Sequence, residues 1–104
     1  MLQVTSNNYQ KILSSYDTIH VIEFYSKLCG HCKMLQKELE ELSRESEEDV
    51  IFGKVDIEEE LFLFQKYDIS SVPTILFIKN GEMKEKLVGY YPKIIINENI
   101  KKIK

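Results

Sequence analysis

The sequence contains Cys29-Gly30-His31-Cys32 shortly after an apolar run, His20-Val21-Ile22-Glu23-Phe24-Tyr25, and immediately before a helical pattern that begins at Lys33. These two cysteines are the only ones in the chain, and they are three positions apart at an expected strand-to-helix junction. The first turn of a helix has unpaired N–H groups and the positive end of the helix dipole, which both favour a thiolate over a thiol. The pattern therefore predicts two thiols that form and break a disulfide with each other.

The two cysteines are expected to differ in role. Cys29 lies at the helix start, and Lys27 lies two residues before it, so we expect Cys29 to be the attacking, more thiolate-like sulfur. Cys32, one turn further into the helix, is expected to be the less accessible sulfur that resolves the mixed disulfide.

A metal site, a structural crosslink or an inert pair would account for the two cysteines less well. A zinc site normally needs four ligands, and only His20 and His31 remain as good candidates. A disulfide that closes so small a ring constrains the unfolded chain little, so it is a poor structural crosslink. Two inert buried cysteines are a third possibility, but Gly30 and His31 between them favour exposure.

Length and composition indicate one soluble globular domain over residues 1–104. Apolar residues make up 43% and charged residues 30%, and the net charge of −3 predicts no nucleic-acid partner. No segment approaches the length of a transmembrane helix, so no membrane partner is expected. Residues 1–8 show no secretory signal, which predicts a cytoplasmic location, although a chain already trimmed of its signal would look the same.

Strand and helix patterns alternate along the chain and predict an α/β domain with a mixed sheet between helices. Strands are expected over Leu2–Thr5, Ile19–Tyr25, Val50–Val55, Thr74–Ile78 and Met83–Val88, with a hairpin turn at Asn80-Gly81 before the last. Four helices are expected: one capped by Ser6 or Asn7, one from Cys29 to about Glu47, one over Glu58–Tyr67 with an acidic first turn, and one at the C-terminus. Apolar residues at helical spacing predict which side chains face inward. In chain order, these are Tyr9, Ile12, Leu13 and Tyr16; Leu35, Leu39 and Leu42; Leu61 and Phe64; and Ile96, Ile100 and Ile103.

Two charged residues fall within apolar strands. Glu23 lies mid-strand, where burial would raise the pKa of its carboxyl group and allow it to take and return the proton of Cys32. The alternative is a strand-end glutamate turned to solvent. Lys54, in the neighbouring strand, is placed to reach towards Glu23 and tune it, or else it is a solvated strand-end lysine.

A proline and a glycine occupy unusual positions beside the expected strands. Pro73 follows Val72 and precedes a central strand, where proline is normally excluded. A cis Val72-Pro73 bond would explain the placement, but cis bonds are too rare for the spacing alone to establish one. Gly89 ends a strand where backbone can approach another molecule closely, although such a glycine is more often a bulge or turn.

Together, these residues resemble the thioredoxin-fold dithiol–disulfide oxidoreductases from end to end. The segment from Val21 to Lys33 is most similar to the active-site segment of a protein disulfide isomerase. Further landmarks of the family follow in order, at Gly53-Lys54-Val55-Asp56, Ser71-Val72-Pro73-Thr74, Lys79-Asn80-Gly81-Glu82 and Val88-Gly89. The resemblance implies a thioredoxin fold, in which a central mixed β-sheet is flanked by helices on both faces.

The resemblance also implies a role for each residue. Cys29 would be the nucleophile and Cys32 the resolving thiol, with Gly30 and His31 in the active-site loop between them. Glu23 would be the family's buried acid, with Lys54 as its neighbour. The substrate-binding residues would be Pro73, as a cis-proline facing the disulfide, Val72, whose backbone pairs with an extended substrate, and Gly89, which lets that substrate approach. No cofactor is implied beyond the redox-active disulfide itself.

The function that follows is reduction or exchange of protein disulfides. Its implied partners are disulfide-containing proteins and an upstream reductase such as a thioredoxin reductase, and the chain is expected to be a monomer. His31 occupies a position where thioredoxins usually have proline and isomerases have histidine. A histidine there can stabilise the thiolate of the reduced form and make the couple more oxidising, or it can be an exposed loop residue without effect.

Two alternatives follow from the same features. The first, supported by His31, is a disulfide isomerase or thiol oxidase in an oxidising compartment. The second is a non-catalytic module that binds extended peptides in the groove near Pro73.

Three departures from the family pattern concern the surface around the disulfide. Leu28 replaces the tryptophan usually found before the first cysteine, which alters the aromatic rim. Lys37 replaces the proline that commonly kinks the active-site helix, so we expect a straighter and locally more stable helix. Tyr90 and Tyr91 follow Gly89 and are expected to supply apolar surface beside the site.

Overall fold

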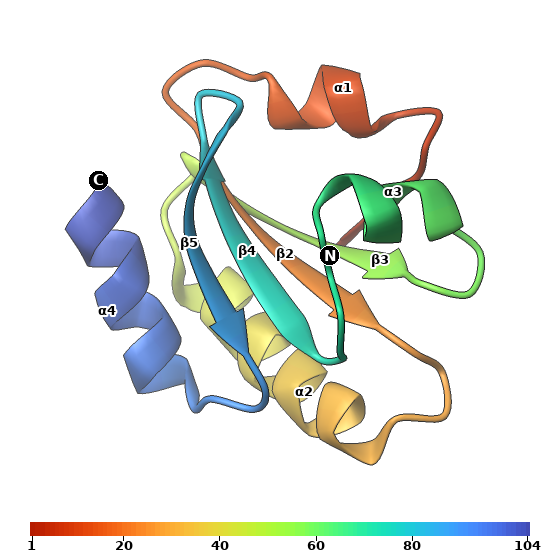
Figure 1. The fold of residues 1–104 in the computed structure, drawn as a ribbon. Coiled ribbons are helices and arrows are strands. Elements are labelled where there is room, and N and C mark those ends of the chain that lie inside the picture. The colour runs from red at the N-terminus through yellow and green to blue at the C-terminus, as the bar shows by residue number, and fades with distance from the viewer.

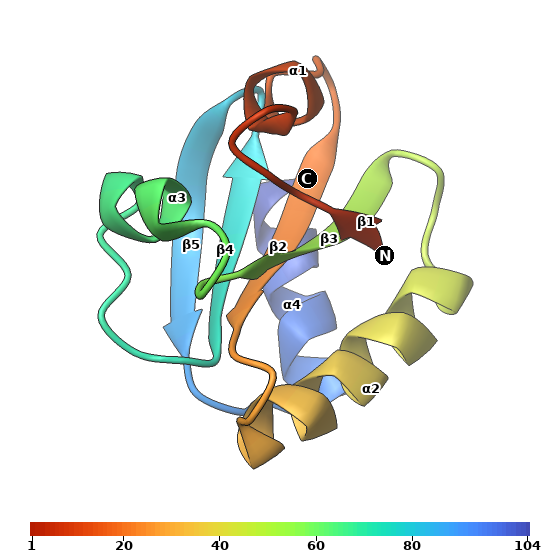
Figure 2. The ribbon, with the colours of Figure 1, turned by 90° about the vertical axis from the view of Figure 1, so that its right-hand side faces the viewer.

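The computed structural model describes residues 1–104 and contains a five-stranded sheet with helices on both faces (Figures 1 and 2). The elements in chain order are β1 (Leu2–Gln3), α1 (Tyr9–Leu13), β2 (Ile19–Tyr25), α2 (Gly30–Glu45), β3 (Val50–Asp56), α3 (Leu61–Lys66), β4 (Thr74–Lys79), β5 (Glu82–Val88) and α4 (Lys93–Ile103). This architecture confirms the predicted α/β fold class.

Strand β2 lies at the centre of the sheet, whose order is β1-β3-β2-β4-β5. It pairs in parallel with β3 and antiparallel with β4, and β5 pairs antiparallel with β4, so the sheet is mixed, as predicted. Asn80 and Gly81 join β4 to β5 with positive φ angles of 53° and 81°, which is the backbone of the predicted tight hairpin turn. The loop that leaves β2 and the segment that enters β4 lie at the same end of the sheet (Figures 1 and 2).

Each face of the sheet packs against its own pair of helices because residues alternate along the strands. On one face, Val21 and Phe77 pack with leucines of α2 and isoleucines of α4. On the other, Ile22 and Leu76 pack with α1 and α3. The expected inward residues Leu35, Leu39, Leu42, Tyr9, Leu13, Ile96 and Ile100 are all buried.

The predictions for α1 and α3 were wrong at their ends. Helix α1 stops at Leu13, where the hydroxyl groups of Ser14 and Ser15 donate to carbonyl oxygens of the last turn, and Tyr16 beyond it is 79% exposed. Leu61 is 59% exposed, and the buried leucine of α3 is Leu63.

The acidic residues before α3 form a turn after β3 instead of the first helical turn. The Asp56 side chain accepts a hydrogen bond from the Glu58 N–H (3.0 Å), and the Asp56 carbonyl accepts from the N–H groups of Glu59 and Glu60. These bonds delay the start of the helix to Leu61.

Candidate active site

Cys29 and Cys32 form a disulfide at the start of α2, with their Cα atoms 5.2 Å apart. Cys29 is the N-cap residue of this helix, and its Sγ accepts a hydrogen bond from the Cys32 N–H at 3.1 Å. Cys29 is half-buried, whereas Cys32 is only 1% exposed. The expected difference in access between the two sulfurs is therefore present, and Gly30 and His31 between them are exposed.

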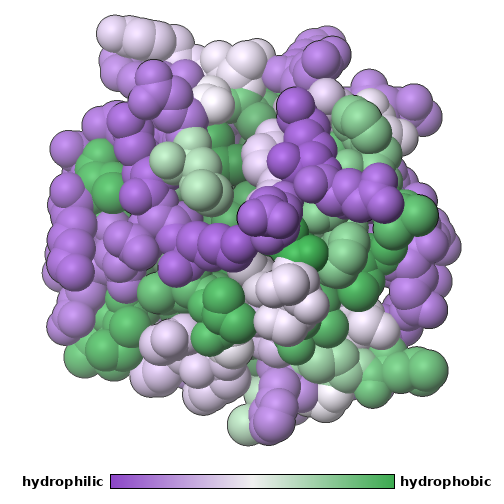
Figure 3. All heavy atoms as spheres, in the orientation of Figure 1, coloured by the Kyte–Doolittle hydropathy of each residue, from purple (hydrophilic) through white to green (hydrophobic).

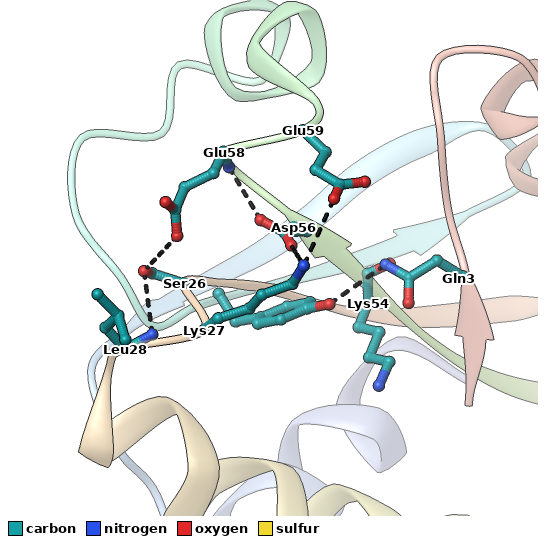
Figure 4. A network of polar contacts seen from close by, with 9 residues as sticks. Gln3, Ser26, Lys27, Leu28, Lys54, Asp56, Glu58 and Glu59 are labelled. Atoms are coloured by element: carbon teal, nitrogen blue, oxygen red, sulfur yellow. Dashed lines mark hydrogen bonds and ion pairs between the residues drawn. The ribbon is translucent and has the colours of Figure 1, made fainter.

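Lys27 does not act as the free cation that its position beside Cys29 suggested. Its Nζ lies 3.4 Å from Glu59 and 3.6 Å from Asp56, and Figure 4 shows the side chain pointing at these two carboxylates. The hydrogen bond to Glu59, together with both negative charges, raises the pKa of Lys27. Asp56, whose part in the site the sequence analysis missed, is buried at the end of β3.

A further pair of hydrogen bonds connects the loop before Cys29 to the turn after β3. The Ser26 hydroxyl donates to the Glu58 carboxylate at 2.9 Å, and the Leu28 N–H approaches the Ser26 hydroxyl at 3.5 Å (Figure 4). Because the turn itself is fixed by Asp56, the loop that presents the disulfide is held against β3.

Glu23 is fully buried in the middle of β2, which rules out the solvent-exposed alternative. Neither carboxyl oxygen has a hydrogen-bond partner. Burial raises the pKa of Glu23 to about 8; the positive charge of Lys54 opposes this rise, and the negative charge of Glu40 adds to it. The carboxyl group is therefore mostly protonated at neutral pH.

Lys54 is the register partner of Glu23 on the neighbouring parallel strand β3, so the two side chains share the sheet face that α2 covers. Lys54 is half-buried, and its Nζ lies 5.6 Å from the centre of the Tyr25 ring. No ion pair joins it to Glu23, so it influences the buried acid through its charge alone.

Pro73 and Gly89 lie next to each other at the disulfide end of the sheet. The Val72-Pro73 peptide bond is cis, Pro73 is buried, and the Gly89 N–H donates to the Pro73 carbonyl at 2.8 Å. Thr74, which follows Pro73, pairs with Phe24 near the end of β2, so this segment adjoins the loop that carries the cysteines. Gly89 has a φ of +101°, a left-handed conformation that favours glycine.

The expected apolar surface beside the site is formed only in part. Leu28 is 91% exposed and Tyr90 is 38% exposed, whereas Tyr91 packs against the core between the sheet and helices α2 and α4. Figure 3 shows apolar residues gathered in the lower half of one face, where Figure 1 places the loops at the disulfide end. The Lys93 N–H donates to Glu38 at 3.1 Å, which ties the segment after Tyr91 to α2.

A cavity of about 520 Å³ lies beside the buried cysteine, where α2 passes the ends of β2 and β3. Its wall includes Cys32 and Lys54, together with Lys33, Gln36 and Glu40 of α2. The sequence analysis missed these last three residues. Their spacing of three and four positions places them on one helix face, and this was the signal that could have found them.

Two kinds of feature are missing from the described chain. No group of three or more His, Cys, Asp and Glu side chains is placed to hold a metal ion. None of the helices combines the length and apolar character needed to cross a bilayer.

The model of the thioredoxin family matches residues 1–102. The chain belongs to the thioredoxin family. This membership and the mixed sheet confirm the resemblance and the thioredoxin fold. The spacing of the Cys29–Cys32 pair fits a CXXC redox site, and the matched relatives favour neither the isomerase nor the binding-module alternative.

Several thioredoxins resemble the chain over most of its length. "Thioredoxin 2" of Chlorobaculum tepidum is 32% identical over 98 residues, which cover 94% of this chain and 90% of that protein. "Thioredoxin" of Staphylococcus saprophyticus is 31% identical over 102 residues, covering 98% and 96%. The pea "Thioredoxin M-type, chloroplastic" is 30% identical over 99 residues, and the chain spans only 58% of that protein and 55% of its spinach counterpart.

Proposed function

We propose that this chain is a protein dithiol–disulfide oxidoreductase that reduces or exchanges disulfides of other proteins through Cys29 and Cys32. The observation that carries the proposal is the disulfide at the start of α2, with one half-buried and one buried sulfur. The helix start favours the thiolate form of Cys29 once the disulfide is reduced. Membership of the thioredoxin family supports the same chemistry.

In the reducing direction, the Cys29 thiolate attacks one sulfur of a substrate disulfide. The substrate S–S bond breaks, a disulfide between Cys29 and the substrate forms, and the other substrate sulfur leaves and takes a proton from water. Cys32 then loses its proton to the Glu23 carboxylate and attacks Cys29 Sγ. The Cys29–Cys32 disulfide forms, and the second substrate sulfur leaves and takes a proton from water, while Glu23 returns its proton to solvent. Two electrons and two protons have then passed to the substrate.

Glu23 is the proposed proton acceptor because it lies on the sheet face below α2 and has no competing hydrogen bond. With a pKa of about 8, roughly one-tenth of the carboxyl groups are ionised at pH 7, which is sufficient for a general base. Lys54 increases this fraction because its positive charge lowers the pKa of Glu23.

The segment around Pro73 is the proposed substrate groove. An extended substrate would pair with the Val72 backbone and pass close to Gly89, and the hydrogen bond between Gly89 and Pro73 holds the two sides of the groove together. His31 is exposed beside Cys29, where we propose that it stabilises the thiolate and raises the reduction potential.

The proposed partners are disulfide-containing proteins and an upstream reductase such as a thioredoxin reductase. We propose that the chain acts in the cytoplasm as a monomer with one domain over residues 1–104, without a nucleic-acid or membrane partner. No bound cofactor is required, because the electrons of the reaction are carried by the two cysteines.

Insulin reduction tests this function. With dithiothreitol as the reductant, the wild-type protein should accelerate the reduction of insulin disulfides, and Cys29→Ser should abolish the acceleration. Circular dichroism should show that the variant is folded, and wild-type protein with both thiols alkylated is the matched control. Undiminished activity of Cys29→Ser would overturn the proposal.

A further inference from the structure

Lysine is the commonest residue in the wall of the cavity beside Cys32. Its wall contains four lysines: Lys27, Lys33, Lys37 and Lys54. Glu40 is the only acidic residue of the wall. The volume of about 520 Å³ falls within the range of small-ligand pockets. The chain as a whole has a net charge of −3, so the excess of positive charge is local to this cavity.

Most of this positive charge has no carboxylate partner within the protein. Lys27 is paired with Asp56 and Glu59, but no ion pair involves the other three lysines. The Glu40 carboxylate already accepts a hydrogen bond from Gln36 at 3.2 Å. Three ammonium groups without an ion pair therefore share the cavity with a single carboxylate, and the Lys54 ammonium group faces the Tyr25 ring.

The lack of counter-charge is unfavourable at these positions, mildly so for the exposed Lys33 and Lys37 and more so for the half-buried Lys54. Lys33 and Lys37 are four residues apart on α2, a spacing at which like charges destabilise a helix. Lys54 extends from β3 towards the helix layer, away from the carboxylates that bind Lys27 (Figure 4). Its buried neighbour Glu23 is mostly uncharged at neutral pH and does not neutralise it. A bound anion would relieve both unfavourable arrangements.

We propose that this cavity binds a small dianion of the phosphate class, either inorganic phosphate or the phosphate group of a monoester, through Lys33, Lys37 and Lys54. Lysine ammonium groups bind phosphate oxygens as compact point charges. The cavity extends past these groups to Tyr25 and Ser26, which leaves space for the organic part of a monoester. One consequence of this binding rests on the proposed redox function. An anion beside Cys32 disfavours the Cys32 thiolate and therefore slows resolution of the mixed disulfide.

Isothermal titration calorimetry of the oxidised protein tests binding without requiring redox activity. Inorganic phosphate and phenyl phosphate are the two probes, with ionic strength held constant by sodium chloride. We expect saturable binding that Lys37→Gln and Lys54→Gln each weaken by up to about fivefold, as expected for loss of one solvent-accessible ion pair. Glu40→Gln should tighten binding by a similar factor, a gain that unfolding cannot produce.

Lys102→Gln is the matched control, because it removes the same charge from an exposed position on α4 that does not line the cavity. Its affinity should equal that of the wild type. Tighter binding of phenyl phosphate would assign a monoester, and equal binding would assign the free ion. Absence of saturable binding, or equal weakening by Lys102→Gln and Lys37→Gln, would overturn the proposal. Insulin reduction would be unaffected by that failure, so the two proposals can fail separately.

Discussion

Glu23 and Lys54 are register partners on adjacent parallel strands, yet no ion pair joins the buried carboxyl group to the ammonium group. Lys54 lines an open cavity, whereas Glu23 is fully buried. The lysine lowers the pKa of the acid, but burial has the larger effect and leaves it at about 8. This balance makes the proposed proton acceptor sensitive to pH in the neutral to mildly alkaline range.

The first prediction concerns the pH dependence of the resolving step. Its rate should rise with pH through an inflection near pH 8, as Glu23 ionises, and Glu23→Gln should remove this inflection. Lys54→Met should move the midpoint to higher pH, because it removes the charge that lowers the pKa of Glu23. Rapid acid quenching and mass spectrometry of the mixed disulfide measure the rate. An unchanged profile in Glu23→Gln would exclude Glu23 as the acceptor.

The second prediction concerns stability. Glu23 binds its proton more tightly in the folded chain, with a pKa of about 8 against 4.5 ordinarily. The stability that this bound proton provides is complete below pH 4.5, declines as pH rises above 4.5, and is lost once pH has risen through 8. At pH 7 the loss is about 3 kcal/mol. The stability advantage of Glu23→Leu over the wild type should therefore be larger at pH 7 than at pH 4.5, by about 3 kcal/mol.

Urea unfolding of both proteins from pH 4.5 to 8 measures the effect as a difference. The difference should be smallest at the acid end and grow with pH. A constant difference across this range would show that Glu23 titrates alike in the folded and unfolded chains.

Much of this site could be predicted from the sequence. The cysteine spacing, the apolar strand around Glu23 and the hairpin at Asn80-Gly81 are local patterns with few structural solutions. The burial of Glu23 was predicted from the apolar run around it, and Val21, Ile22 and Phe24 of that run are all core residues.

Other features depend on contacts between distant segments. Lys27 forms ion pairs with Asp56 and Glu59, which are more than 25 residues away in the sequence, and no local sequence pattern predicts that pairing. The exposure of Leu61 follows from a turn that Asp56 organises after β3. The cavity could not be predicted from local sequence, because its wall combines Lys54 of β3 with Lys33 of α2.

The third prediction uses two glycines at the site. Gly89→Ala should lower the free energy of unfolding by about 1–3 kcal/mol, because its φ of +101° is unfavourable for alanine. Gly30→Ala is the matched control, since a Cβ there meets no atom within 4 Å and the residue lies in the first turn of α2. Its effect should be below about 1 kcal/mol and stabilising. Equal effects at both positions would contradict a backbone requirement at Gly89.

The fourth prediction concerns His31. Ordinary thioredoxins have reduction potentials near about −270 mV, and we expect a higher value here because His31 stabilises the reduced form. His31→Pro should lower the potential of the couple towards that figure. Equilibration against a dithiothreitol buffer measures both proteins. A wild-type value at or below about −270 mV would show that His31 does not govern the couple.

Trapping of the mixed disulfide tests the central claim most directly. The reduced Cys32→Ser variant, mixed with a disulfide-containing protein, should accumulate a one-to-one covalent complex through Cys29, visible by mass spectrometry and released by dithiothreitol. Cys29→Ser should form far less of it, because Cys32 is buried. Trapping by Cys29→Ser in place of Cys32→Ser would contradict the proposed roles, and trapping by neither would contradict thiol–disulfide exchange itself.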